Sequence, residues 1–294
     1  MLSRYSAFLP LVLSLVAFIL NIVALSAGHQ KGVLEEYAIA RVNTSMLGHD
    51  LLQTHQSAND NEDDNDSFLN KVTNKWDEAA DDTKNSIGDI TNDIADKMAN
   101  ALGISEWYSA HITDACRGSF KPNSTAPGAT LNVTACTKSP LSRFDLSGML
   151  DSELSASPLG FTLSDLHWPT EINKAIDSLN HALLGLFVLF IFIIGFSILE
   201  FLGCVDFLLT KRSNLICINL WVALLGFLCI FISSIIVTAA AHKGVEQINS
   251  FGKGIDISAN LGSKFLHLIW ISTVLMGSTV VYWAVSLRFK KLEK

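Results

Sequence analysis

The feature that most constrains this chain is the apolar run from Ala182 to Leu199, in which no residue carries a charge. A hydrocarbon layer about 30 Å thick is crossed by roughly 20 helical residues of this kind. A buried helix of a soluble protein would be shorter and would keep a polar stripe. We therefore interpret the run as a membrane span.

Three further apolar runs accompany it, between Arg4 and His29, within Ser213 to Ala241, and within Phe265 to Leu287. Together they predict an all-α membrane protein, a bundle of four transmembrane helices with a large outer domain between the first two. The expected division is an inner N-terminus at 1–6, spans at 7–27, 181–204, 214–241 and 265–287, an outer domain at 28–180, an inner loop at 205–213, an outer loop at 242–264, and an inner tail at 288–294.

The first apolar run admits two interpretations. A cleaved signal peptide would use Arg4 as its basic start and the segment 25–27 as its cleavage site, after an apolar core of about 7–15 residues. The uncharged stretch between Arg4 and His29 is longer than such a core. A retained span is the preferred interpretation, and its polar Asn21 is expected to face a neighbouring helix.

Charge is distributed unevenly along the chain. Residues 28–180 contain 23 acidic and 11 basic side chains, and the whole chain has a net charge of −7. Nucleic-acid binding requires clustered Lys and Arg, so an acidic block beside apolar spans argues against it. The expected partners are the lipid bilayer and either further copies of this chain or other membrane proteins.

The expected outer domain combines an acidic linker with a helical pattern. The run 59–66 (NDNEDDND) is typical of a solvated linker. Between Phe68 and Leu102, apolar residues recur every three or four positions, which predicts one helical face ending at Gly103. This face either packs on its own domain or binds a partner. The remainder is expected to be a small segment, for which strands are one option.

The outer domain also contains two cysteines and every N-glycosylation sequon of the chain. The sequons begin at Asn43, Asn65, Asn123 and Asn132. Their confinement to one region agrees with a luminal or extracellular location. In that oxidising compartment, Cys116 and Cys136 are expected to form a disulfide worth about 3 kcal/mol. The alternative, a metal site, lacks two further ligands at suitable spacing, so no metal is expected.

Basic residues near the ends of the spans predict the orientation. With both termini in the cytoplasm, every sequon lies outside, and the chain is expected in the plasma membrane. The basic residues on the inner side are then Arg4, Lys211, Arg212, Arg288, Lys290, Lys291 and Lys294.

The chain contains none of the catalytic spacings H-E-x-x-H, G-x-S-x-G or G-x-x-x-x-G-K-[ST]. Neither an enzyme nor a cofactor is therefore expected. Glu200 and Asp206 come in the last turns of the second span, where they are expected to reach Lys211, Arg212 or headgroup water. A transport or gating role is the alternative, since acids inside a membrane are often functional.

Two weaker hypotheses concern single side chains near the membrane edges. Cys204 lies at the expected cytoplasmic edge, a position suited to reversible palmitoylation, and an ordinary buried thiol is the alternative. Imidazole titrates near neutral pH, so four histidines at the outer ends of the spans suggest pH sensing, unless they are merely tolerated at an interface. These histidines are His29, His181, His242 and His267.

The four spans, the large first outer loop and the sequence GISEWYSAHITDAC…ACTKSP together resemble the fungal Sur-seven/PalI family. In that family an aromatic-Tyr-Ser stretch precedes one cysteine, and a polar-Lys-Ser/Pro turn follows a second. The matching positions are Trp107, Tyr108 and Ser109 before Cys116, and Thr137 to Pro140 after Cys136. Trp107 and Tyr108 are expected to pack near the cysteine pair and to anchor this segment to the helix at 68–102.

The resemblance implies a non-enzymatic protein of the static furrows of fungal plasma membranes, called eisosomes. Its implied work is to organise the membrane and the assembly of the cell wall and cortex. A PalI-like accessory of ambient-pH signalling is the alternative within the family. Claudins, to which the family is likened, suggest a further alternative, an adhesion or channel-modulating protein. Their signature places Trp closer to the first cysteine, and the two cysteines closer together, than Trp107, Cys116 and Cys136 are here.

Overall fold

The computed structural model describes residues 7–47, 103–124, 126–137, 144–156, 162–164, 168–210, 212 and 214–292. Four of its helices are long and apolar enough to cross a membrane. The prediction of four such helices is therefore confirmed. They are α1 (Phe8–Ser26), α6 (Thr170–Thr210), α7 (Leu215–Phe251) and α8 (Ser263–Leu292).

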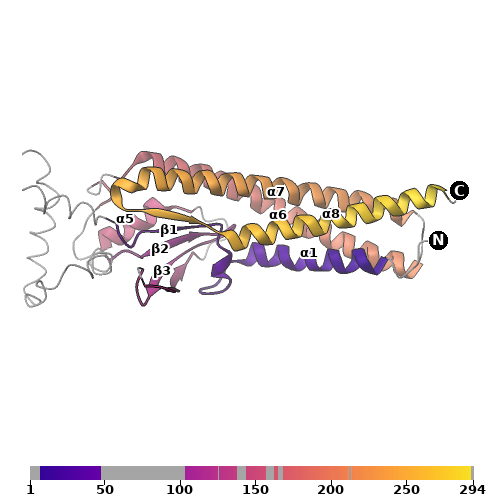
Figure 1. Ribbon diagram of the computed structural model, residues 1–294, viewed down its shortest axis with the longest axis horizontal. Helices are drawn as coiled ribbons and strands as arrows, with labels where there is room; N and C mark the ends of the chain where they lie inside the picture. The colour runs from indigo at the N-terminus through magenta and orange to yellow at the C-terminus, as the bar shows by residue number, and fades with distance from the viewer. Residues whose placement is uncertain are drawn as a thin grey trace, which may run out of the picture.

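The four helices pack side by side as a bundle (Figure 1), in which α1 contacts α6 and α8 while α7 contacts α6 and α8. The buried side chains of α1 include Ala17, Asn21 and Ala24, which recur every three or four residues along one face. As expected, Asn21 faces a neighbouring helix, where the Ser272 hydroxyl of α8 donates a hydrogen bond of 3.0 Å to its side-chain oxygen. The first apolar run is thus an integral part of the bundle.

Two of the helices are much longer than a hydrocarbon layer requires. With 41 residues in α6 and 37 in α7, these helices extend about 60 Å and 55 Å, against a layer of about 30 Å. Their additional turns lie at the end of the bundle away from the two termini and flank a β-sheet there (Figure 1). Helix α6 begins eleven residues before the expected start of its span at 181, and α7 continues ten residues past 241.

The sheet has five antiparallel strands in the order β4-β3-β2-β1-β5. Two 3-10 turns, η2 (Glu35–Tyr37) and η4 (Gly252–Ile255), and a short helix, α5 (Leu146–Ala156), accompany it. We call the strands, η2 and α5 the sheet domain. The strands are β1 (Ala40–Asn43), β2 (Trp107–Ala110), β3 (Ala115–Lys121), β4 (Thr130–Cys136) and β5 (Ser258–Leu261).

Strand β5 comes from the segment 242–264, which was expected to be a plain outer loop. It pairs with β1 from Ala40 opposite Leu261 to Asn43 opposite Ser258. The close approach depends on Gly262, because a Cβ atom there would lie 1.7 Å from the carbonyl oxygen of Ala38. Both connections at this end of the bundle therefore build one sheet.

The two faces of the sheet bury different side chains, since neighbouring residues of a strand point to opposite sides. On one face Val42, Tyr108 and Ala259 join the main core that continues into the bundle. On the other face Trp107 packs with Cys116 and Val133 in a small separate core. The expectation that Trp107 and Tyr108 both lie near the cysteine pair thus holds for Trp107, but Tyr108 faces the main core.

The segment for which strands were one option is a sheet in the described residues, so the helical bundle is joined to a small β-sheet. The helix expected at 68–102 and the linker at 59–66 lie outside the described residues, as does Asn65.

Candidate functional site

The site begins at the turn η2, which carries Glu35 into the small core of the sheet domain. Leu34, directly before it, has a left-handed backbone with φ of 57°, which is uncommon for a residue other than glycine. Strained backbone of this kind is retained where the surrounding structure fixes it. The result is a carboxylate that is only 6% exposed.

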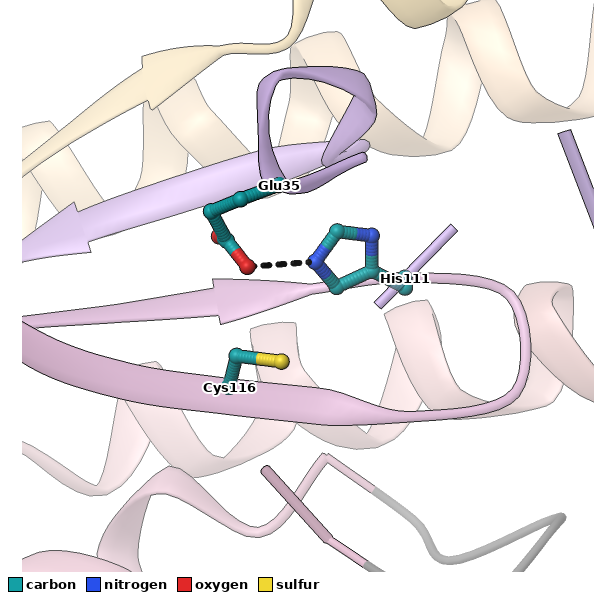
Figure 2. A group of neighbouring side chains, drawn as sticks. All are labelled: Glu35, His111 and Cys116. Atoms are coloured by element: carbon teal, nitrogen blue, oxygen red, sulfur yellow. Dashed lines mark hydrogen bonds and ion pairs between the residues drawn. The ribbon is translucent and has the colours of Figure 1, made fainter. Parts of the chain in front are cut away.

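His111 lies at the end of β2 and faces that carboxylate (Figure 2). Its Nε2 atom is 3.3 Å from Oε2 of Glu35 and 3.4 Å from the hydroxyl of Ser109. Gly28, with φ of +79°, covers the ring so closely that a Cβ atom there would lie 2.4 Å from it. The histidine is 1% exposed, so its contact with Glu35 is shielded from solvent.

Arg41 on β1 completes a network of three charged or titratable groups. Its Nη2 atom lies 3.7 Å from the second carboxylate oxygen of Glu35 and donates to the backbone carbonyl of the same residue. The guanidinium also stacks 5.5 Å from the ring centre of Trp107, a cation–π contact. Burial lowers the pKa of Arg41, and the neighbouring Glu35 carboxylate opposes that effect.

The expected cysteine pair lies beside this network. Cys116 on β3 and Cys136 on β4 are directly opposite each other and are joined in a disulfide. One donor atom each from Glu35, His111 and Cys116 lie within 4.8 Å of one another (Figure 2). A bridged sulfur is not a thiolate, so in this state the cluster offers a metal ion only two good ligands.

A second polar cluster fastens α5 to the sheet. The Glu153 carboxylate accepts hydrogen bonds from the backbone N–H of Ser105 at 2.8 Å and from the Tyr108 hydroxyl. It also forms an ion pair with Arg117 of β3. Burial raises the pKa of Tyr108, and the adjacent negative charge of Glu153 raises it further. Because its polar groups are already hydrogen-bonded or ion-paired, we interpret this cluster as structural and not as a reactive site.

A groove of about 820 Å³ extends over the sheet domain, from η2 and β5 to the β3–β4 hairpin. An exposed ion pair between Glu36 and Lys264 lies at its rim. Other side chains that line it include Tyr37, Arg41, Phe120, Leu131 and Asn260.

The bundle contains a buried carboxyl, which overturns one expectation. Glu200 is 0% exposed, and neither of its carboxyl oxygens has a hydrogen-bond partner among the described residues. Thr279 and Trp283 of α8 lie beside it without reaching hydrogen-bond geometry. Glu200 therefore lies on the face of α6 that packs against α8, and it does not reach headgroup water. Asp206 is exposed, as expected.

The sequon asparagines in the described part of the chain are all half-buried. Asn43 accepts a hydrogen bond from the backbone N–H of Ser45, and the Asn132 amide donates to the Ser119 hydroxyl. Asn123 follows β3 in the hairpin to β4. Whether they carry glycans stays a prediction.

The four histidines proposed for pH sensing are exposed and have separate partners. His29 is 3.6 Å from Asp114, whereas His181 and His242 each bond a backbone carbonyl of their own helix, from Asp177 and Thr238. The structure does not assemble them into one cluster. Among the histidines of the described residues, His111 is the one that is itself buried beside an acidic partner, Glu35, and no motif in the sequence singles it out.

Palmitoylation at Cys204 is not supported, because that side chain is 0% exposed and packs with Trp283 in the bundle. Cys217, near the start of α7, is the exposed thiol at the same end of the bundle. Cys204 lies on the buried face of α6. An apolar run without polar residues does not show in advance which face of the helix is buried.

Comparison with known protein families supports the resemblance noted above. The model of the SUR7/PalI family matches residues 6–282 of this chain. No curated protein and no solved structure matches it.

Proposed function

Given that this chain belongs to the SUR7/PalI family of membrane proteins, we propose that it is a non-enzymatic organiser of eisosome-type domains in a fungal plasma membrane. In this role it supports the assembly of the cell wall and cortex. The bundle anchors it in lipid, and the sheet domain is the part that faces the wall.

The observation that carries this proposal is the single sheet built from both connections at one end of the bundle. Strand β5 pairs with β1 and contacts α7, so the sheet domain is continuous with the membrane anchor. A rigid connection of this kind suits a protein that holds position between membrane and wall. A flexibly tethered domain would not fix the position of the bundle relative to the wall.

Under this proposal, both termini lie in the cytoplasm and the sheet domain lies outside the cell. Figure 1 has the two termini at the same end of the bundle, opposite the sheet. Arg212 and Arg288 lie toward the end with the termini, consistent with basic residues on the cytoplasmic side.

We propose that the bundle associates within the membrane with further copies of this chain or with other membrane proteins. Helix α7 exposes large apolar side chains along much of its length, which either lipid or a neighbouring protein can cover. They include Ile218, Trp221, Leu225, Leu228, Ile232 and Ile235.

Photobleaching of a fluorescently tagged chain at the cell surface tests the proposal. We expect static patches with little recovery over minutes, unchanged between acidic and neutral medium. Gly262→Ala, which separates β5 from β1, should make the surface population mobile. Gly254→Ala is the matched control, since a Cβ atom there meets nothing within 4 Å. Rapid recovery of the unaltered chain would contradict the proposal.

A PalI-like accessory of ambient-pH signalling is the second candidate, and the buried pair of Glu35 and His111 favours it. Imidazole is the side chain whose ordinary pKa lies nearest to physiological pH. Under this candidate, deletion of the gene blocks growth at alkaline pH, and His111→Gln reproduces the defect whereas His267→Gln does not. Normal alkaline growth of the deletion strain would exclude it.

A further inference from the structure

We propose that opening the Cys116–Cys136 bridge creates a zinc site, in which the two thiolates, Nε2 of His111 and the Glu35 carboxylate bind the ion. Sequence spacing offered no two further ligands for this cysteine pair. The fold supplies them from η2 and from the end of β2.

The donor set matches the preferences of Zn²⁺, which takes four ligands in a tetrahedron from thiolate, imidazole and carboxylate groups. The Glu35, His111 and Cys116 donor atoms already lie within 4.8 Å of one another. Cys136 is the directly opposed residue on the next strand. Opening the bridge frees both cysteine side chains to rotate toward the Glu35 and His111 donors.

The charges of the site also balance. Two thiolates and one carboxylate carry three negative charges, and a zinc ion leaves one of them uncompensated. Arg41, 3.7 Å from Glu35, supplies the remaining positive charge and holds the carboxylate as an outer partner. The Nδ1 atom of His111 has no hydrogen-bond partner among the described residues, so it is free to carry the ring proton while Nε2 binds zinc.

The chemistry requires a reductant, and a dithiol is the appropriate class. The dithiol transfers two electrons and two protons to the bridge, which becomes two thiols while the dithiol becomes a cyclic disulfide. Zinc then displaces one proton from each thiol, so binding releases two protons. Cys136 is half-buried whereas Cys116 is 1% exposed, so both the dithiol and the ion enter from the Cys136 side.

The sheet domain would therefore have two alternative cross-links. In the bridged state a covalent bond ties β3 to β4, and in the reduced state zinc ties the same strands to η2 and β2. Because zinc binds only the folded reduced form, it stabilises that form by mass action. A chain that has not yet been oxidised, or has been reduced again, therefore keeps its fold.

The test uses the full chain in detergent, with Cys204, Cys217 and Cys229 replaced by Ser. Half of the sample is treated with dithiothreitol, which is then removed without oxygen, and both halves receive zinc chloride. We expect one bound zinc per reduced chain and less than about one tenth of that in the bridged chain. His111→Gln and Glu35→Gln should each weaken zinc binding at least about tenfold. His29→Gln is the matched control and should bind normally.

Two further measurements keep the proposal falsifiable if a variant fails to fold. Cobalt in place of zinc should give the reduced chain a thiolate charge-transfer band and a tetrahedral visible spectrum. Zinc should raise the melting temperature of the reduced sheet domain and leave that of the bridged one unchanged. Absence of zinc uptake by the reduced chain, uptake unaffected by His111→Gln, or no rise in melting temperature would each overturn the proposal.

Discussion

The bundle and the sheet domain bury polar side chains in different ways. In the bundle, most are small and form single hydrogen bonds within a helix or to a neighbouring helix, such as Ser234 with Thr273 at 2.8 Å and Asn21 with Ser272 at 3.0 Å. In the sheet domain they are charged and form networks around Glu35 and Glu153. The bundle also buries an acidic side chain, Glu200, whose carboxyl oxygens find no partner in the described part of the structure.

This difference reflects what each region has available to hold it together. Lipid surrounds the bundle, so helix packing and satisfied backbone keep it folded with few polar contacts. The sheet domain has short strands and, on one face, only a small separate core, which it supplements with a disulfide, ion pairs and a stacked Trp107. Changes to its polar groups should therefore unfold it while the bundle persists.

The largest expected effect comes from the small core of the sheet domain. Trp107 is 0% exposed and donates a hydrogen bond to the Ser119 carbonyl, so Trp107→Ala should cost about 3–5 kcal/mol. Pulse proteolysis across a urea series measures this loss in the free energy of unfolding. Trp221→Ala is the matched control, since that ring is 60% exposed. A similar loss for both would remove the distinction between the two regions.

Removal of the bridge is the next largest change. Cys116→Ser together with Cys136→Ser opens a loop with a sequence separation of 20, which should destabilise the sheet domain by about 3 kcal/mol. The helical circular dichroism of the bundle should melt at the same temperature as before. If both regions melted earlier by the same amount, they would form one cooperative unit.

Replacing the buried acid of the bundle should act in the opposite direction. Glu200→Leu removes an unsatisfied carboxyl from the helix interface and should stabilise the bundle by about 1–3 kcal/mol. Thermal unfolding of the purified chain measures this change, with Asp206→Leu as the exposed control. A clear loss of stability would mean that Glu200 is satisfied by a partner in the membrane.

The cluster around Glu153 predicts an alkaline limit to the stability of the sheet domain. The pKa of Tyr108 is raised in the fold, so folding favours its protonated form. Stability is full below the unfolded pKa of about 10 and declines as pH rises above it. Tyr108→Phe should cost about 1 kcal/mol at neutral pH and should flatten that alkaline decline. Unfolding curves between pH 7 and 11 would show an unchanged decline if the tyrosine were not responsible.

The smallest expected effect concerns the hydrogen bond between α1 and α8. A double-mutant cycle with Asn21→Ala and Ser272→Ala should give a coupling of about 0.6 kcal/mol, typical of polar contacts inside membranes. A coupling of several kcal/mol would make the bundle as dependent on polar contacts as the sheet domain. Equilibrium unfolding in mixed micelles is the suitable measurement.

The bundle was predictable from the sequence because each span is encoded locally, in one uncharged run such as Ala182 to Leu199. The sheet was not, because β1 and β5 are four residues long and lie more than 200 residues apart. No local pattern identifies such a pair.

The candidate site divides in the same way. The disulfide partners were visible as two cysteines in one polar region, and Trp107 was visible from the family motif. Glu35, Arg41 and His111 look like ordinary surface residues in the sequence. Only the fold shows that a turn, a strand and a strand end bring them together in the interior.

The most direct test of the account is a cross-link between β1 and β5. Ala40→Cys with Leu261→Cys places two cysteines at directly opposed positions, whereas Ala40→Cys with Asn260→Cys is one residue out of register. Peptide mass spectrometry of the non-reduced chain, with the three free cysteines replaced by Ser, reads the link. We predict a 40–261 disulfide in most molecules and little 40–260 disulfide. Equal or absent linkage in both variants would contradict a sheet shared by the two connections.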